Sequence, residues 1–249
     1  MWRTMYIMWL REMKRFLRSK SRIVGALGQP LLYFLSLGYG LGAVFQAAGR
    51  GNYIEFLAPG IIGMSIIFTS IFNGMQVIWD RQFGFLKETL VAPVSRLAIM
   101  LGRTFGGATV AALQGCLVFI IMIPAGFRPY DWALVVPAIL VMFLVATLFS
   151  GLGMMVASLL RDMQGFQLIM NFLVMPLFFL SGALFPLQGA PTALQDVAYI
   201  DPLSYGIDGM RSLLINTSNY SLGIDVAVLV GIAALFIILG SYFFSKIQV

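Results

Sequence analysis

Histidine is absent from this chain of 249 residues, cysteine occurs once, and only 10% of the residues are charged. Because histidine and clustered carboxylates are both missing, we expect no metal site and no catalytic residues. The lone Cys116 can form no internal disulfide and falls in an apolar stretch, which is typical of a small core residue. Together with 60% hydrophobic residues, the low charge excludes an ordinary soluble domain, in which about a quarter of the residues are charged.

Stretches without any charged residue cover most of the chain. There are six of them, and each has at least the roughly 20 helical residues that cross a bilayer: 23–49, 56–79, 104–127, 132–160, 163–195 and 226–245. They lack the alternation of polar and apolar residues that marks barrel strands, so helices are expected. The sequence therefore predicts an all-α membrane protein, one transmembrane domain over residues 1–249, with six transmembrane helices at about 24–45, 57–79, 104–125, 133–160, 164–185 and 226–245.

The basic residues are distributed unevenly between the two sides of these spans. Thirteen of the sixteen lie before span one, in the loops after spans two and four, or after span six, and only Arg50, Arg128 and Arg211 lie in the opposite loops. Because basic loops stay in the cytoplasm, both termini are expected to be cytoplasmic in a multi-pass protein of the inner (plasma) membrane. The same placement accounts for the net charge of +6, so the expected partner is the lipid bilayer and no nucleic acid.

The first 22 residues have the pattern of a basic amphipathic helix. Apolar residues recur at helical spacing at positions 2, 5, 6, 9, 10, 13, 16 and 17, with Arg and Lys mainly between them. Such a helix lies in the interface of an anionic leaflet. Two roles fit this pattern: an anchor that fixes topology, or a connection between a cytoplasmic partner and the spans.

The loop between spans two and three has a similar, shorter pattern. Phe83, Leu86 and Leu90 lie at i, i+3 and i+7, and Pro93 ends the pattern, which predicts a short amphipathic helix within residues 80–96. A cytoplasmic helix of this kind can dock into a groove on a partner protein. The residues proposed for that contact are Asp80, Arg81, Phe83, Phe85, Leu86, Lys87, Glu88 and Leu90. The alternative is a solvated basic loop.

Polar side chains inside the spans also fall at helical spacing. Thr69, Asn73 and Gln76 share one face of span two, and Gln164, Gln167 and Asn171 share one face of span five. Polar groups need partners in lipid, so these faces are expected to point inward. They either form hydrogen bonds between helices or line a pathway together with the aromatic residues Tyr33, Phe72 and Phe178. A pathway of this composition bears no fixed charge, which favours an amphipathic or mainly apolar cargo.

The segment before span six is longer than an ordinary connection. Asp201-Pro202 has the pattern of an N-cap followed by proline at the first helical position. The helix that follows would bring Asp208 and Arg211 together at i, i+3. From the residues alone, this segment is an interfacial helix with a weak surface ion pair.

The source of energy is indicated by what the spans and loops lack. No G-x-x-x-x-G-K-[ST] phosphate-binding loop occurs, and no charged residue lies at mid-span. Transporters driven by ion gradients usually carry intramembrane carboxylates. We therefore expect a transport subunit that is not itself an enzyme and depends on a separate ATPase; the alternative is a stand-alone secondary transporter or channel.

Several blocks of the sequence, in this order, resemble the type-2 family of ATP-binding cassette (ABC) export permeases. They are FLKETLVAPVSR at 85–96, Gly102-Arg103, PLFFLSGALFP at 176–186, Asp201 to Tyr205, and Asp208 to Arg211. The resemblance implies an interfacial N-terminal helix, a coupling helix between spans two and three, and a re-entrant helical hairpin within 186–215. In that hairpin Pro202, Tyr205, Asp208 and Arg211 would close the outer end of the pathway.

The same resemblance implies partners and cargo. The chain would pair with a second permease copy or a paralogue and with cytoplasmic ABC ATPase subunits, which hold the ATP and Mg²⁺. Drug, lipid and lipo-oligosaccharide exporters are the nearest in pattern.

Overall fold

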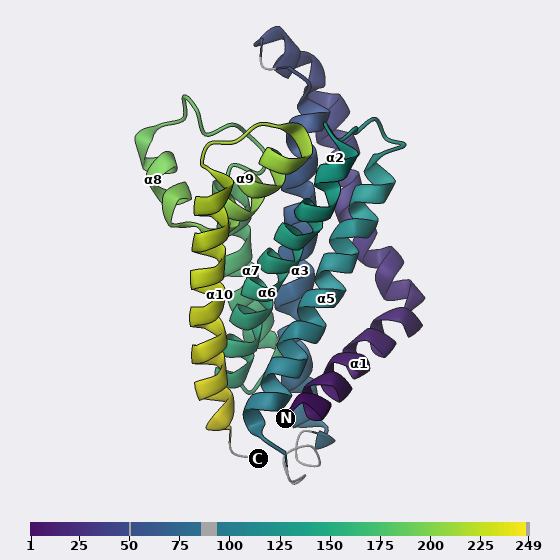
Figure 1. Cartoon of the computed structure of the whole chain (residues 1–249), viewed down its shortest axis with the longest axis vertical. Helices are drawn as coiled ribbons and strands as arrows, with labels where there is room; N and C mark the ends of the chain where they lie inside the picture. Colours follow the sequence, from purple (N-terminus) through teal and green to yellow (C-terminus); the bar gives the residue numbers. More distant parts are fainter. Residues whose placement is uncertain (50, 86–93, 248–249) are drawn as a thin grey trace.

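The computed structural model describes residues 1–49, 51–85 and 94–247, and within these ranges it contains helices and no strand. The helices pack into an upright bundle with both termini at one end (Figure 1). In chain order they are α1 (Trp2–Arg18), α2 (Lys20–Ala47), α3 (Tyr53–Gln82), α5 (Arg96–Met122), the short 3-10 helix η1 (Trp132–Leu134), α6 (Val135–Leu159), α7 (Met163–Leu180), α8 (Thr192–Ile200), α9 (Pro202–Ile215) and α10 (Leu222–Ser245).

Six of these helices are long and apolar enough to cross a membrane, which confirms the predicted all-α fold with six spans. They are α2, α3, α5, η1 with α6, α7 and α10. In the most apolar part of α3, 72% of the residues are buried, against 17% in α2 and α10. The second span is therefore the centre of the bundle, and the first and last spans lie at its rim.

Close backbone contacts hold the central helices together. A Cβ atom added at Gly74 of α3 would lie 2.4 Å from the carbonyl oxygen of Gly153 in α6. One added at Gly153 would lie 2.6 Å from the carbonyl oxygen of Ile71. Real Cβ atoms do not approach so closely, so only glycine permits this α3–α6 contact.

The N-terminal helix packs against α5 in the same way. A Cβ at Gly102 would lie 2.7 Å from the backbone oxygen of Met5, and one at Gly106 would lie 2.9 Å from the Cβ of Glu12. The indole nitrogen of Trp9 donates to the hydroxyl of Thr109 at 3.0 Å. As a result α1 runs obliquely along one end of α5 (Figure 1), and a break at Ser19 separates it from α2.

Several helix ends differ from the sequence-based boundaries. The second-span helix α3 continues through Gln82, so Asp80 and Arg81 belong to its last turn and not to a separate helix over 80–96. Of the residues proposed for that helix, Leu86, Lys87, Glu88 and Leu90 lie outside the described residues. The fifth-span helix α7 ends at Leu180, five residues before the expected end, because Gly182 takes a positive φ of 73° and turns the chain.

The segment expected at 186–215 contains two short helices at the end of the bundle opposite the termini (Figure 1). Asp201 caps the second of them, as predicted: its carboxylate accepts a hydrogen bond from the backbone N–H of Leu203, and Pro202 is the first helical residue. Most of α9 is buried, between α3, α6 and α10. The interfacial helix expected from the residues alone is therefore wrong for α9, which packs inside the bundle.

Candidate functional site

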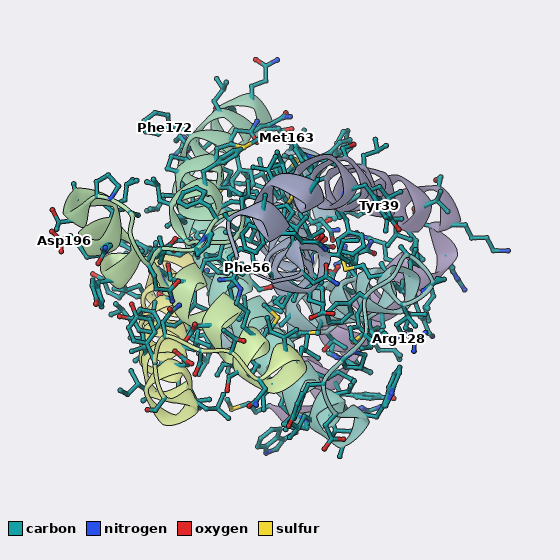
Figure 2. The ribbon with its side chains drawn as sticks, turned by 90° about the horizontal axis from the view of Figure 1, so that it is seen from above. Tyr39, Phe56, Arg128, Met163, Phe172 and Asp196 are labelled. Atoms are coloured by element: carbon teal, nitrogen blue, oxygen red, sulfur yellow. The ribbon has the colours of Figure 1, made fainter. Side chains whose placement is uncertain are left out.

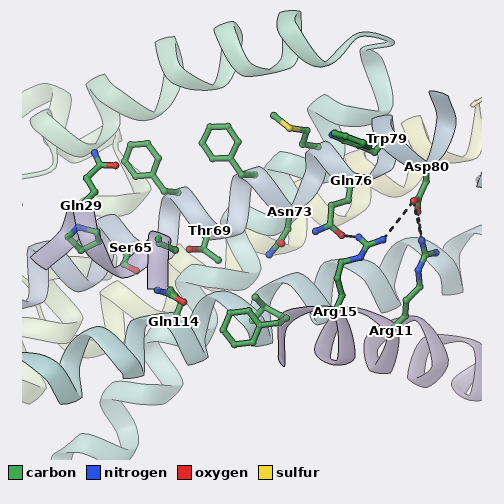
Figure 3. A pocket seen from close by; sticks show the side chains of 18 of the residues that line it. Arg11, Arg15, Gln29, Ser65, Thr69, Asn73, Gln76, Trp79, Asp80 and Gln114 are labelled. Carbon is green, nitrogen blue, oxygen red and sulfur yellow. Dashed lines mark hydrogen bonds and ion pairs between the residues drawn. The ribbon is translucent and has the colours of Figure 1, made fainter. Parts of the chain in front are cut away.

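A cavity of about 700 Å³ lies beside α3, between α1, α2 and α5 (Figure 3). The α3 side chains that line it recur every three or four residues, so they form one face of the helix. The lining residues of α3 are Met64, Ser65, Phe68, Thr69, Phe72, Asn73, Met75, Gln76, Trp79 and Asp80. Four of the predicted pathway residues, Thr69, Phe72, Asn73 and Gln76, thus lie together on this wall.

Asn73 both bonds a neighbouring helix and lines the cavity. Its side-chain amide donates to the backbone oxygen of Gly107 in α5 at 3.1 Å. The two roles that the sequence left open therefore coincide at this residue. Gln76 is also bonded, because its side-chain oxygen accepts from the guanidinium of Arg15 (Figure 3).

Three further uncharged polar residues of the cavity were missed by the sequence analysis: Gln29, Ser65 and Gln114. The hydroxyl of Ser65 and both amide atoms of Gln114 are buried and have no partner among the described residues. Buried polar atoms normally find a partner, so these two side chains are available to a ligand or to water. Ser65 could have been found from its i, i+4 spacing to Thr69. Gln29 and Gln114 come from other helices, and only the fold brings them together.

One end of the cavity is charged. Arg11 of α1 donates to both carboxylate oxygens of Asp80, at 3.1 and 2.9 Å, and Arg103 of α5 donates to the same carboxylate at 2.5 Å. Arg15 lies 4.0 Å from Asp80 and 3.8 Å from Glu12. The prediction of a pathway without fixed charge is therefore wrong at this end. Hydropathy could not reveal this, because the charges come from α1 and from the ends of two spans.

The residues proposed for contact with an ATPase divide into two groups. Asp80 is only 5% exposed and its carboxylate is engaged by arginines, so it does not lie on the surface that a partner would meet. Phe83 and Phe85 follow α3 at the same end of the bundle and are 60% and 57% exposed. Together with the half-buried Arg81 in the last turn of α3, these two aromatic residues are the described part of the proposed contact.

The other predicted pathway residues lie outside this cavity. Gln164, Gln167 and Asn171 are exposed on α7, so the prediction that this face points into the protomer is wrong. The opposite face of α7, with Phe166, Met170, Val174 and Phe178, is the one that packs inside. Phe172, on the exposed face, projects from the rim of the bundle (Figure 2). Tyr33 is half-buried on α2 and is not among the cavity residues.

The predicted gate residues Asp208 and Arg211 lie at the other end of the bundle and are both buried. They do not form the expected ion pair with each other. Arg211 donates to the backbone oxygens of Gly182 and Ala183, at 2.8 and 3.2 Å, and its guanidinium lies 3.9 Å from the centre of the Phe56 ring. Burial lowers the pKa of Arg211 to about 10, so the side chain stays protonated at neutral pH.

Asp208 is held by backbone groups in the same way. Its carboxylate accepts from the backbone N–H groups of Asn219 and Tyr220 and from the Asn219 side chain, at 2.8 to 2.9 Å. The ring of Tyr205 stacks on that of Tyr220 with centres 5.1 Å apart, and the Tyr205 hydroxyl donates to the backbone oxygen of Tyr199. At this end of the molecule these hydrogen bonds join α9 to the turn after it and to the loop after α7.

Comparison with known proteins identifies the family. The family model for the ABC-2 type transporter matches residues 3–215, which contain the cavity and both charged clusters. The chain belongs to the ABC-2 type transporter family. Nodulation protein J of Rhizobium leguminosarum bv. trifolii is 30% identical over 240 residues, covering 96% of this chain and 87% of that protein. The inner membrane transport permease YadH of Escherichia coli K12 is 28% identical, covering 92% of this chain and 90% of that protein.

Membership in the ABC-2 family makes the chain a multi-pass integral membrane protein and the permease of an ABC transporter. The family also implies that this ABC-2 permease works with an ABC ATPase subunit. Within the described part of the chain, no three His, Cys, Asp or Glu side chains gather into a group that could hold a metal ion.

Proposed function

We propose that this permease exports an amphipathic or mainly apolar compound (a drug, a lipid or a lipo-oligosaccharide) from the cytoplasm, driven by ATP that a separate subunit hydrolyses. The observation that carries this proposal is the cavity beside α3. Phe68, Phe72 and Met64 give it apolar walls, and Ser65 and Gln114 offer hydrogen-bonding groups without protein partners. Such a lining suits a ligand with apolar bulk and a few polar groups.

The charged end of the cavity is compatible with this cargo. Asp80 balances part of the charge of Arg11, Arg15 and Arg103 at this end, and the other lining residues are uncharged. A small inorganic ion would lose its hydration shell along the uncharged part without gaining a counter-ion. An amphipathic compound loses little there.

The ATPase subunits, with their ATP and Mg²⁺, would dock at the end that carries both termini, where Phe83 and Phe85 are exposed. The excess of basic residues at this end favours a cytoplasmic location for it. The relative described as an inner membrane transport permease supports an inner-membrane location. Phe83 and Phe85 follow the end of α3 and also line the cavity. Movement of the ATPase subunits would therefore reach the cavity at this end of α3.

A second permease copy would cover the exposed face of α7. Gln167 and Asn171 lie there between large apolar side chains such as Leu168 and Phe172, which are 71% and 83% exposed. Amides facing lipid tails would lack hydrogen-bond partners, whereas a facing copy supplies them. We therefore assign this face to the contact between two permease subunits.

The test of the proposed function is ATP hydrolysis by the permease reconstituted with its ATPase in liposomes. We expect amphipathic compounds to change the rate with the wild-type permease. Thr69→Phe, which places a ring in the cavity, should abolish that response, and Val136→Phe on the exposed surface of α6 serves as the control. A response to small inorganic ions alone would contradict the proposed cargo. Transport without any ATPase would contradict the proposed dependence on ATP.

A further inference from the structure

A second open cavity, of about 920 Å³, lies where α1 meets α2. Its lining is dominated by five basic side chains from the two helices, Arg11, Lys14, Arg15, Arg18 and Lys20. The other lining residues are Ile7, Leu10, Ser19 and Ser21. We call this cavity the α1–α2 groove.

Most of the positive charge in the α1–α2 groove is not neutralised by an acidic side chain in the described part of the chain. Arg11 and Arg15 turn toward Asp80 and Glu12 on the side of the first cavity. Lys14, Arg18 and Lys20 are exposed and form no ion pair with an acidic side chain among the described residues. Three cations therefore face the groove without a counter-ion from residues 1–49, 51–85 and 94–247.

The start of α2 adds hydrogen-bond donors to the groove. The helix begins after Ser19, whose side chain accepts from none of its first backbone N–H groups. Because α1 ends at the same residue, its last carbonyl groups offset the charge of this helix start, and the N–H groups contribute as donors to an anion. The groove thus offers guanidinium, ammonium and hydroxyl donors, features that suit a phosphate group.

The surroundings indicate that this anion belongs to a lipid. Ile7, within the groove, is 51% exposed, and Leu17 and Val24, on either side of the junction, are 62% and 69% exposed. Apolar side chains this exposed beside a membrane span are covered by acyl chains. The groove therefore presents donors for a headgroup next to apolar surface for the tail.

We propose that the α1–α2 groove binds an anionic phospholipid of the bilayer through its phosphodiester headgroup. Lys14, Arg18 and Lys20 hold the phosphate, and Ile7 and Leu10 contact the start of an acyl chain. This site is separate from the proposed cargo cavity, although Arg11 and Arg15 border both. It depends neither on the ATPase nor on the identity of the cargo.

The test compares lipid retention by two variants that lose the same charge. The full-length permease is reconstituted in bilayers of phosphatidylcholine with a minor fraction of phosphatidylglycerol and then extracted. The ratio of the two lipids bound to it is measured by native mass spectrometry. Lys14→Gln with Arg18→Gln removes two groove charges, whereas Arg3→Gln with Arg161→Gln removes two exposed charges elsewhere. We expect the groove pair to lower the preference for phosphatidylglycerol by about fivefold per charge, and the control pair to leave it nearly unchanged.

Two results would overturn the proposal. An equal loss in both pairs would mean that overall charge, not the groove, selects the lipid. Displacement of the bound lipid by inorganic phosphate would assign the groove to a soluble anion. The wild-type permease gives a reading that does not depend on variant folding: it must retain phosphatidylglycerol over phosphatidylcholine, and no preference at all would also refute the site.

Discussion

The two ends of the bundle hold buried charges in different ways. At the end with the termini, Asp80 is held by the side chains of Arg11 and Arg103, from helices far apart in the sequence. At the opposite end, Asp208 and Arg211 are held by backbone N–H and carbonyl groups of nearby loops. At the first end, the buried charges stabilise one another. At the second end, each buried charge is stabilised by the backbone of a loop.

This difference determines how each end should respond to substitution. Removing one member of a buried ion-pair network leaves the others uncompensated, so a second substitution can restore part of the loss. Removing a charge held by backbone groups leaves those groups unsatisfied, and changing the other charge does not help.

The largest expected effect is that of Asp80→Asn. This variant leaves Arg103, which is only 4% exposed, without its counter-ion. We therefore expect the free energy of unfolding to fall by about 3–5 kcal/mol. The apparent melting temperature in detergent measures it, with Asp196→Asn on exposed α8 as the control. Adding Arg103→Met to Asp80→Asn should recover much of the loss. A double variant no better than Asp80→Asn alone would contradict the network.

At the opposite end, Arg211→Lys keeps the charge but cannot reproduce the bonds to Gly182 and Ala183 or the contact with Phe56. We expect the free energy of unfolding to fall by about 3 kcal/mol, because weaker hydrogen bonds from the lysine replace two charge-assisted hydrogen bonds. Combining it with Asp208→Asn should give the sum of the two single losses in the same melting measurement. Recovery in the double variant would mean that the two ends do not differ as described.

Asp201 gives a pH-dependent test of the same end. Burial raises the pKa of its carboxyl to about 7, although the N–H of Leu203 opposes that rise. When the pKa of an acid is higher in the folded state than in the unfolded state, the folded protein binds more protons. Its free energy of unfolding therefore falls as pH rises. As pH rises from 5 to 7, deprotonation of this side chain should lower the free energy of unfolding by about 2 kcal/mol. Asp201→Asn, which can still cap α9, should weaken the dependence of the melting temperature on pH between pH 5 and 7. An unchanged slope would argue against a buried, protonated Asp201.

The smallest expected effect is that of Trp9→Phe. This change removes the hydrogen bond to Thr109 but keeps most of the apolar contact between α1 and α5, so we expect a loss of about 1 kcal/mol. Thr109→Val tests the same bond from the other side, and the double variant should lose no more than the larger single loss. Independent, additive losses would show that the bond does not hold α1.

Apolar stretches were enough to predict six spans, but not where each helix ends. Charges end the uncharged stretches near Asp80 and Arg103, whereas α3 and α5 continue past them because those charges pair inside the bundle. Helical spacing placed Thr69, Asn73 and Gln76 on one face correctly. The same spacing failed for Gln167 and Asn171, since a period shows which residues share a face and not which way that face points.

The remaining residues of the candidate site could not be predicted from their own helices. Gln29, Gln114 and Arg15 meet the α3 face only because α1, α2 and α5 pack around it. No local pattern encodes that meeting. For the same reason the sequence suggested an Asp208–Arg211 pair from spacing, while the structure directs each charge to a different loop.

The central claim, that the cavity beside α3 receives the cargo, is tested most directly by protection of a single cysteine. In a Cys116→Ser background, Thr69→Cys places a thiol on the cavity wall and Val136→Cys places one on the exposed surface of α6. An amphipathic compound that changes ATP hydrolysis should slow maleimide labelling at position 69 and leave labelling at position 136 unchanged. Equal labelling rates at position 69 with and without that compound would contradict the claim.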